Sequence, residues 1–163
     1  NESIRLNELG ISSELALETS GHGALKENYF LDDGAYQIAK ILVKIATLHQ
    51  TGGGTIDALI EPLKEPAEAL EIRPKVKIED FSAYADKVLE AFVDFVEAQK
   101  DWERTPDNFE GVHVTVPNGW ILVRKSLHDP QIPINIESDQ EGGAKAIKQQ
   151  IMAFLESFDD LKY

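Results

Sequence analysis

A run of alternating residues between positions 111 and 124 constrains the fold more than any other feature. Valine occupies positions 112, 114 and 116, and His113 and Thr115 separate the three valines. A period of two is that of a β-strand with one buried face. The Pro117-Asn118-Gly119 segment that follows is a hairpin turn signal. Residues 120–124 are therefore predicted to return as an antiparallel strand.

Other periodic segments flank this hairpin. Residues 81–100 and the last 17 residues or so carry apolar side chains at helical spacing, and residues 75–78 and 132–136 have strand patterns. The resulting order, β-α-β-β-β-α, predicts an α+β domain over residues 75–163. We expect an antiparallel four-stranded sheet with two helices on one face, similar to the fold of the TATA-box-binding protein.

The first part of the chain has a different pattern. Residues 1–62 are predicted to be the incomplete C-terminal part of an α/β domain, with a short strand at 15–17 and a helix from about residue 35 to 48. Apolar residues surround this helix on nearly all sides, so we expect it to be well buried. Residues 63–74 contain Pro66 and Pro74 and are predicted to be a linker.

The charge of the chain excludes some classes of partner. There are 29 acidic and 16 basic residues, which gives a formal net charge of −13. Nucleic acids and anionic membranes attract proteins that present a basic face, so neither is expected as a partner. A small anionic ligand remains possible, because a few local donors suffice to hold it.

The sequence has no cysteine, which excludes disulfides, thiolate nucleophiles and cysteine metal sites. No apolar run approaches the roughly 20 residues that a membrane span needs. The polar, acidic start of the chain does not resemble a signal peptide. These features together predict a cytoplasmic protein.

Two short segments carry groups that could bind a ligand. Glu18, Ser20 and His22 place a carboxylate, a hydroxyl and an imidazole within five residues, and such groups can bind the hydroxyls of a sugar. Arg124 and Ser126, at the end of the predicted return strand, supply a guanidinium group and a hydroxyl, which are the donors that a phosphate needs. His49, His113 and both tryptophans are predicted to have surface or packing roles.

Both segments resemble loops of the α-D-phosphohexomutase family, of the phosphomannomutase/phosphoglucomutase type. Residues 18–22 match its Glu-x-Ser-Gly-His sugar loop, and Asp32-Asp33-Gly34 follows at the family's spacing. Residues 124–130 match its Arg-x-Ser-x-Thr-Glu-Pro phosphate loop, although His128 replaces the threonine and Asp129 the glutamate. Pro133 occupies a position where many members have a second arginine.

The resemblance implies a substrate-binding role. It assigns Glu18, Ser20 and His22 to the sugar of a hexose phosphate, and Arg124, Ser126 and His128 to its phosphate. The family interconverts hexose 1-phosphate and hexose 6-phosphate, and its phosphoserine loop and aspartate-rich magnesium loop do not occur in this sequence. We therefore expect no catalytic or metal-binding residue here, an inactive fragment, and Mg²⁺ bound by the missing N-terminal domains.

Two questions stay open at the level of sequence. The domain could be a non-enzymatic α+β binding or regulatory module that shares the fold, since fold does not imply function. The sugar loop also suits glucose and mannose equally, so the preferred hexose and the oligomeric state are not predicted.

Overall fold

The computed structural model describes residues 2–18, 21–106, 108, 110–127 and 129–163. The chain forms two compact units, residues 1–64 and residues 65–163. Ser20 and His128, both assigned to ligand binding above, lie outside the described residues. Each unit is considered by itself below.

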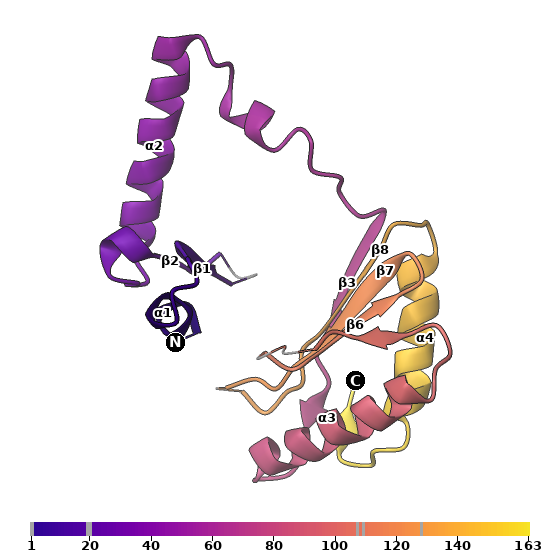
Figure 1. Cartoon of the computed structure of the whole chain (residues 1–163). Coiled ribbons are helices and arrows are strands. Elements are labelled where there is room, and N and C mark those ends of the chain that lie inside the picture. Colours follow the sequence, from indigo (N-terminus) through magenta and orange to yellow (C-terminus); the bar gives the residue numbers. More distant parts are fainter. Residues whose placement is uncertain (1, 19–20, 107, 109, 128) are drawn as a thin grey trace. The chain divides into compact units, whose positions relative to one another are not determined.

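The first unit is built from a hairpin and one long helix (Figure 1). Strands β1 (Leu15–Leu17) and β2 (Gly23–Leu25) pair in antiparallel fashion, preceded by helix α1 (Glu2–Glu8). Two short 3-10 helices, η1 (Lys26–Asn28) and η2 (Ile56–Leu59), flank helix α2 (Gly34–Thr51). The Asp33 side chain caps α2 by accepting a hydrogen bond from the backbone N–H of Tyr36 at 3.0 Å.

The expectation that this long helix is well buried is wrong for this chain. Ile38 and Val43 are 60% and 64% exposed, and Leu48 is the buried apolar residue of α2. A helix is buried only where other elements cover it, and the hairpin and short helices of this unit have too little surface to do so. The apolar pattern therefore indicated the helix correctly but not its burial.

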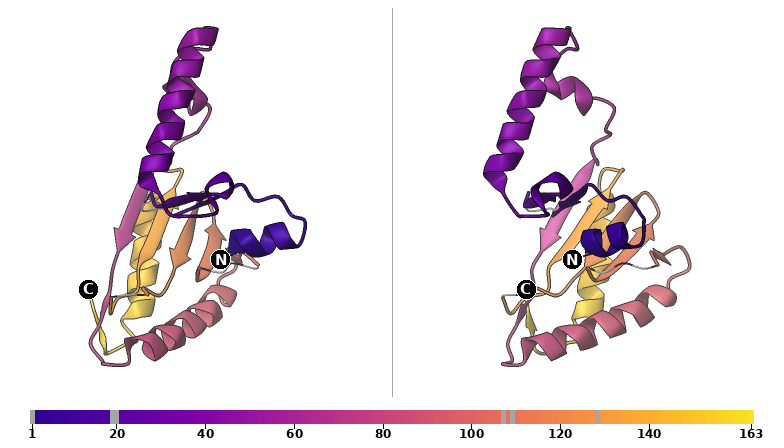
Figure 2. Two further views of the ribbon diagram at one scale, coloured as in Figure 1. Left: turned by 90° about the vertical axis from the view of Figure 1, so that its left-hand side faces the viewer. Right: turned by 60° about the vertical axis from the view of Figure 1, so that its left-hand side comes forward.

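The second unit is an α+β domain, as predicted. Its elements are β3 (Glu68–Ile72), β4 (Lys75–Val76), α3 (Phe81–Glu97), β5 (Glu103–Arg104), β6 (Val112–Val116), β7 (Gly119–Val123), β8 (Ile134–Ser138), α4 (Gly143–Leu155) and β9 (Leu161–Lys162). Five strands form one antiparallel sheet in the order β3-β8-β7-β6-β5. Helices α3 and α4 lie on the same face of this sheet, as the two views of Figure 2 show.

Two details differ from the sequence prediction. The sheet has five strands rather than four, because residues 68–72, within the predicted linker, form the edge strand β3 and residues 103–104 form the other edge strand, β5. The strand expected at 75–78 is limited to β4, which pairs with β9 outside the main sheet. Pro66 and Pro74 lie just outside β3, where a missing backbone N–H breaks no pairing. The prolines therefore bound a strand instead of marking a linker.

The core lies between the sheet and its two helices. The valines of β6 face the helices, and His113 and Thr115 face the other side, as the alternation predicted. The strand register brings Ile121 beside Ile136 and Val123 beside Ile134, all fully or almost fully buried. The helices contribute the buried residues Ala85, Val88, Phe92, Val96, Ala144, Ile147, Ile151 and Leu155.

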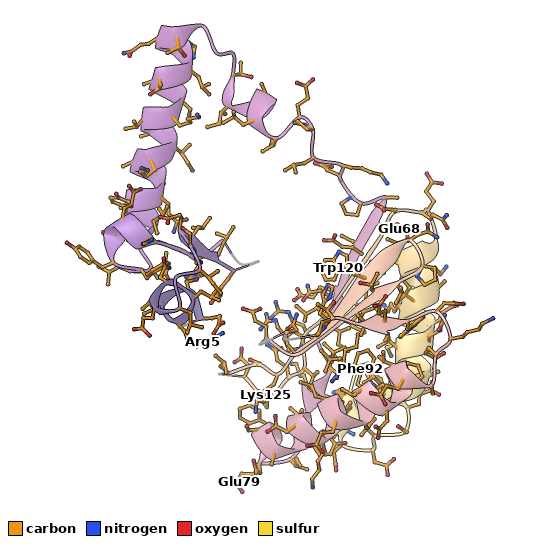
Figure 3. The ribbon with its side chains drawn as sticks, in the orientation of Figure 1. Arg5, Glu68, Glu79, Phe92, Trp120 and Lys125 are labelled. Carbon is orange, nitrogen blue, oxygen red and sulfur yellow. The ribbon has the colours of Figure 1, made fainter. Side chains whose placement is uncertain are left out.

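Two local features hold this sheet in its register. The predicted turn is present, with Asn118 in the left-handed region at φ 59°, and a Cβ atom on Gly119 would lie 2.2 Å from the backbone oxygen of Glu137. On β3, the Glu68 carboxylate accepts hydrogen bonds from the backbone N–H groups of Gly142 and Ala144, at 2.8 and 3.0 Å. Glu68, labelled in Figure 3, thus caps α4 and ties the edge strand to that helix.

Candidate functional site

The sugar-loop candidate, residues 18–22, connects β1 to β2. The backbone N–H of Glu18 donates to the oxygen of His22 at 2.8 Å, and that of Gly21 donates to the oxygen of Glu18 at 3.0 Å. Gly21 adopts φ 90°, a conformation that favours glycine. The hairpin therefore brings Glu18 and His22 to one end of the two strands, where both are exposed.

His22 pairs with a residue to which the sequence analysis assigned no binding role. Its Nδ1 atom lies 2.7 Å from Oδ2 of Asp32. Asp33, the next residue, is the helix cap, so the two aspartates have different roles. A spacing of ten residues between a histidine and an aspartate carries no local signal, which is why the pair was missed.

A hollow of about 380 Å³ lies beside this pair, lined by Gly21, His22, Asp32, Gly34 and Gln37. The Nε2 atom of Gln37 donates to the oxygen of Gly23 at 2.6 Å, so α2 holds the second strand of the hairpin in place. The hydrogen bond to Asp32 and its negative charge, with a further contribution from Glu18, raise the pKa of His22. The hollow is thus lined by donors and acceptors suited to a polyhydroxylated ligand.

Changing Asp32 to asparagine should lower the pKa of His22. The variant removes the carboxylate that favours the imidazolium form, so the pKa falls towards the ordinary histidine value of about 6.5. An NMR titration of the His22 ring protons measures the change directly. Asp33→Asn is the matched control, because Asp33 caps α2 and does not pair with His22. An unchanged pKa in Asp32→Asn would contradict the pair.

The phosphate-loop candidate, residues 124–130, follows β7 and returns to β8. The backbone N–H of Arg124 donates to the oxygen of Pro133 at 3.0 Å, which extends the β7–β8 pairing by one residue beyond Val123. The N–H of Ser126 then donates to the oxygen of Gln131 at 3.2 Å. The loop is thus closed at its base by backbone hydrogen bonds on both sides.

The side chains of this loop have distinct environments. Arg124 is half-buried and forms no ion pair with any residue that the structure describes. Ser126 is 9% exposed, and its Oγ accepts a hydrogen bond from the backbone N–H of Asp129 at 3.1 Å. The hydroxyl shapes the turn in this way and keeps its own proton available to donate. Pro133 is buried and offers its backbone oxygen to Arg124, and its hydrocarbon ring has no donor for a ligand.

Two further residues near this loop were not predicted. Lys125 forms an ion pair with Asp86 of α3, at 2.6 Å between Nζ and Oδ1. Asn135 is paired with Leu122 across β7 and β8, on the face of the sheet away from the helices. Both relationships depend on contacts between residues far apart in the sequence, which local patterns do not show.

The aromatic residues that were predicted to pack do so. Trp102 contacts Phe95 edge to face, with ring centroids 5.7 Å apart. Trp120 stacks on His113 at 5.5 Å and donates from Nε1 to Glu137 at 3.0 Å. Among the described residues, no three histidine, aspartate or glutamate side chains gather as they would around a metal ion. None of the helices among the described residues is long and apolar enough to cross a membrane.

Comparisons of sequence give a consistent set of relatives. The chain is 28% identical over 138 residues to a phosphomannomutase/phosphoglucomutase of Pseudomonas putida, covering 83% of this chain. It is 26% identical over 147 residues to the protein of the same name from Pseudomonas aeruginosa, and 30% identical over 136 residues to that from Pseudomonas syringae pv. tomato. These matches cover 89% and 82% of this chain. No family model matches the chain.

The fold has a solved counterpart as well. A crystal structure of a phosphoglucomutase/phosphomannomutase family protein from Burkholderia thailandensis matches 96% of this chain with a TM-score of 0.67 and 22% sequence identity. The chain spans only 27–29% of the length of its sequence relatives and 30% of that structure. The resemblance predicted from two loops is confirmed, for a chain much shorter than the proteins that it resembles.

Proposed function

On the premise that this chain resembles phosphomannomutase/phosphoglucomutases over more than four fifths of its length, we propose that it is a substrate-binding C-terminal part of a phosphohexomutase. In this proposal the longer protein is an isomerase that interconverts hexose 1-phosphate and hexose 6-phosphate through a bisphosphorylated sugar. The ligand of this chain is a hexose phosphate.

The observation that carries the proposal is that Arg124 is half-buried and has no ion-pair partner among the described residues. A half-buried guanidinium group with no acidic partner among the described residues can bind an anion from outside the chain. It lies beside Ser126, whose hydroxyl can donate, in a loop whose base is fixed by backbone hydrogen bonds. A guanidinium group binds phosphate through two parallel hydrogen bonds, which makes it a strong and directional ligand. We propose that His128 adds a third donor.

The sugar loop supports the second half of the proposal. Glu18 and His22 are exposed at the end of one hairpin, and Asp32 holds the imidazole from the other side. A carboxylate accepts hydrogen bonds from sugar hydroxyls, and an imidazolium group donates to their oxygens. We propose that Glu18, Ser20 and His22 bind the hydroxyl groups of the hexose. Binding of this kind orients the substrate, and orientation is a large part of catalysis of phosphoryl transfer.

The chemical step belongs to other parts of the protein in this proposal. Phosphoryl transfer needs a phosphate carrier and a metal ion that offsets developing negative charge. We propose that the N-terminal domains of the longer protein supply the phosphoserine and the Mg²⁺ site, and that this chain alone does not turn over substrate. The role of the present residues is to bind and orient.

Changing Glu18 to alanine should separate the role proposed for the sugar loop from the role proposed for the phosphate loop. We expect weaker binding of glucose 1-phosphate and mannose 1-phosphate, by about 1–2 kcal/mol, because a charged acceptor for sugar hydroxyls is lost. Binding of inorganic phosphate should not change, because it has no sugar hydroxyls. Calorimetric titration of the chain with each ligand measures both effects.

Glu14→Ala is the matched control for this variant. Glu14 is exposed in the same unit and is occupied by Ser12 and Lys26, so its loss should leave affinity for all three ligands unchanged. Equal losses for phosphate and for sugar phosphates in Glu18→Ala would count against a sugar-binding role for Glu18.

A further inference from the structure

Lys125 lies between the two residues proposed to bind phosphate, yet its side chain is directed elsewhere. The Nζ atom lies 2.6 Å from Oδ1 of Asp86 and 3.4 Å from Oγ of Ser82, both on helix α3. Figure 3 labels Lys125 near this helix. A lysine next to a phosphate-binding arginine would ordinarily be regarded as a second phosphate ligand. Its contacts instead attach the loop to the helix.

The strand geometry explains this direction. Val123 is buried on the helix side of the sheet, and successive side chains of a strand point to opposite faces. The hydrogen bond from the N–H of Arg124 to Pro133 continues the pairing beyond Val123, so the alternation continues as well. Arg124 therefore lies on the face of the sheet that no helix covers. Lys125 lies on the helix side, where its ammonium group forms an ion pair with Asp86.

Helix α3 is a rigid element of the unit. The loop itself is held by backbone hydrogen bonds between its two ends and, at Pro130, by the backbone N–H of Val76 of β4, at 2.8 Å. Asp86 follows the fully buried Ala85, and the Asp80 side chain caps the helix by accepting from the N–H of Ala83 at 3.2 Å. Within the loop, the described hydrogen bonds of Ser126 reach only Gln131 and Asp129, at 3.2 and 3.1 Å. The ion pair of Lys125 therefore adds a link from the loop to a rigid element.

We infer that Asp86 is a positioning residue for the phosphate loop. By holding Lys125 on the helix side, Asp86 fixes the backbone between Arg124 and Ser126 in the arrangement that presents the guanidinium group and the hydroxyl to a phosphate. Asp86 also neutralises the lysine, so Arg124 supplies the positive charge on the ligand side. This role for Asp86 rests on the proposed function of the loop.

Asp86→Ala separates this role from direct binding of phosphate by Lys125. If Lys125 were a ligand, removing Asp86 would free its ammonium group and remove a nearby negative charge, so inorganic phosphate would bind more tightly. A positioning role predicts the opposite, namely weaker binding by about two- to fivefold, the range expected for an exposed ion pair. Lys125→Ala should show the same loss, the double variant no further loss, and Lys125→Arg close to wild-type affinity.

Asp94→Ala is the matched control, because Asp94 is an exposed aspartate on the same helix and its side chain pairs with neither Lys125 nor any other described residue of the loop. It removes the same charge, and phosphate affinity should stay the same or rise slightly. The measurement is a calorimetric titration of the full chain with inorganic phosphate. Phosphate affinity in Asp86→Ala that equals or exceeds that of the wild type would overturn the positioning role.

A second readout separates this inference from the proposed function. Without ligand, hydrogen exchange of the Ser126 amide should be faster in Asp86→Ala and Lys125→Ala than in Asp94→Ala, because the loop has lost its link to α3. Equal exchange in these variants would overturn the inference whether or not phosphate binds. An Arg124→Ala chain that binds phosphate normally would instead overturn the proposed function, and the exchange result would still decide the role of Asp86.

Discussion

Changing Arg124 to alanine is expected to weaken binding of inorganic phosphate and of hexose phosphates by about 1.5–3 kcal/mol, the contribution of hydrogen bonds to a charged group. The loss should be similar for both kinds of ligand, because the guanidinium group is proposed to contact the phosphate that they share. Arg124→Lys should recover only part of the affinity, since an ammonium group keeps the charge but loses the two parallel hydrogen bonds. Calorimetric titration of each variant gives the comparison.

The matched control for Arg124 is Arg73→Ala. Arg73 is an exposed arginine of the same unit that forms an ion pair with Glu71 at 2.8 Å. Its removal changes the net charge by the same amount, but it should leave phosphate affinity almost unchanged because exposed charges are screened by salt. Equal affinities in the Arg124 and Arg73 variants would remove the assignment of the phosphate loop.

Changing Phe92 to alanine is expected to destabilise the second unit by about 3–5 kcal/mol, the range for a large aromatic side chain lost from a core. Phe92 is fully buried, and its ring lies 6.1 Å from that of Phe95 and 5.5 Å from that of Phe154. Helix α3 would lose this contact with Phe154 of α4. Figure 3 labels Phe92 within helix α3.

Urea unfolding followed by tryptophan fluorescence measures this effect in the second unit alone. Both tryptophans of the chain, Trp102 and Trp120, belong to that unit. Leu127→Ala is the control, since Leu127 is 81% exposed and its removal should change stability by less than about 0.5 kcal/mol. A loss below about 1 kcal/mol in Phe92→Ala would instead show that the neighbouring side chains can repack and fill the cavity.

The extent to which the fold could be predicted depended on whether a signal was local. The alternation at 112–116 and the turn at 117–119 are properties of adjacent residues, and the β6–β7 hairpin is present as predicted. Strand β3 could not be predicted in the same way, because it exists through its pairing with β8, more than 60 residues later. For α2, the apolar residues predicted a helix, but its burial depends on neighbouring elements that residue periodicity does not report.

The same distinction applies to the site. The types of residue in each loop predict a ligand-binding chemistry, since Glu18 with His22 and Arg124 with Ser126 are close in sequence, and that chemistry stays a prediction. The side-chain pairs at these loops were not predictable from local sequence. His22 contacts Asp32, ten residues later, and Lys125 forms an ion pair with Asp86 of another element. Local sequence therefore indicated which groups could bind a ligand, and the fold was needed to identify the residues that pair with these loops.

The most direct test of the roles proposed for the two loops is an NMR titration of the isotopically labelled chain with inorganic phosphate and then with glucose 1-phosphate. We predict that the amide signals of residues 124–127 shift with both ligands, and that those of residues 18–23 shift only with the sugar phosphate. Shifts confined to other parts of the chain, or equal shifts of both loops with phosphate alone, would contradict the assignment of a phosphate loop and a separate sugar loop.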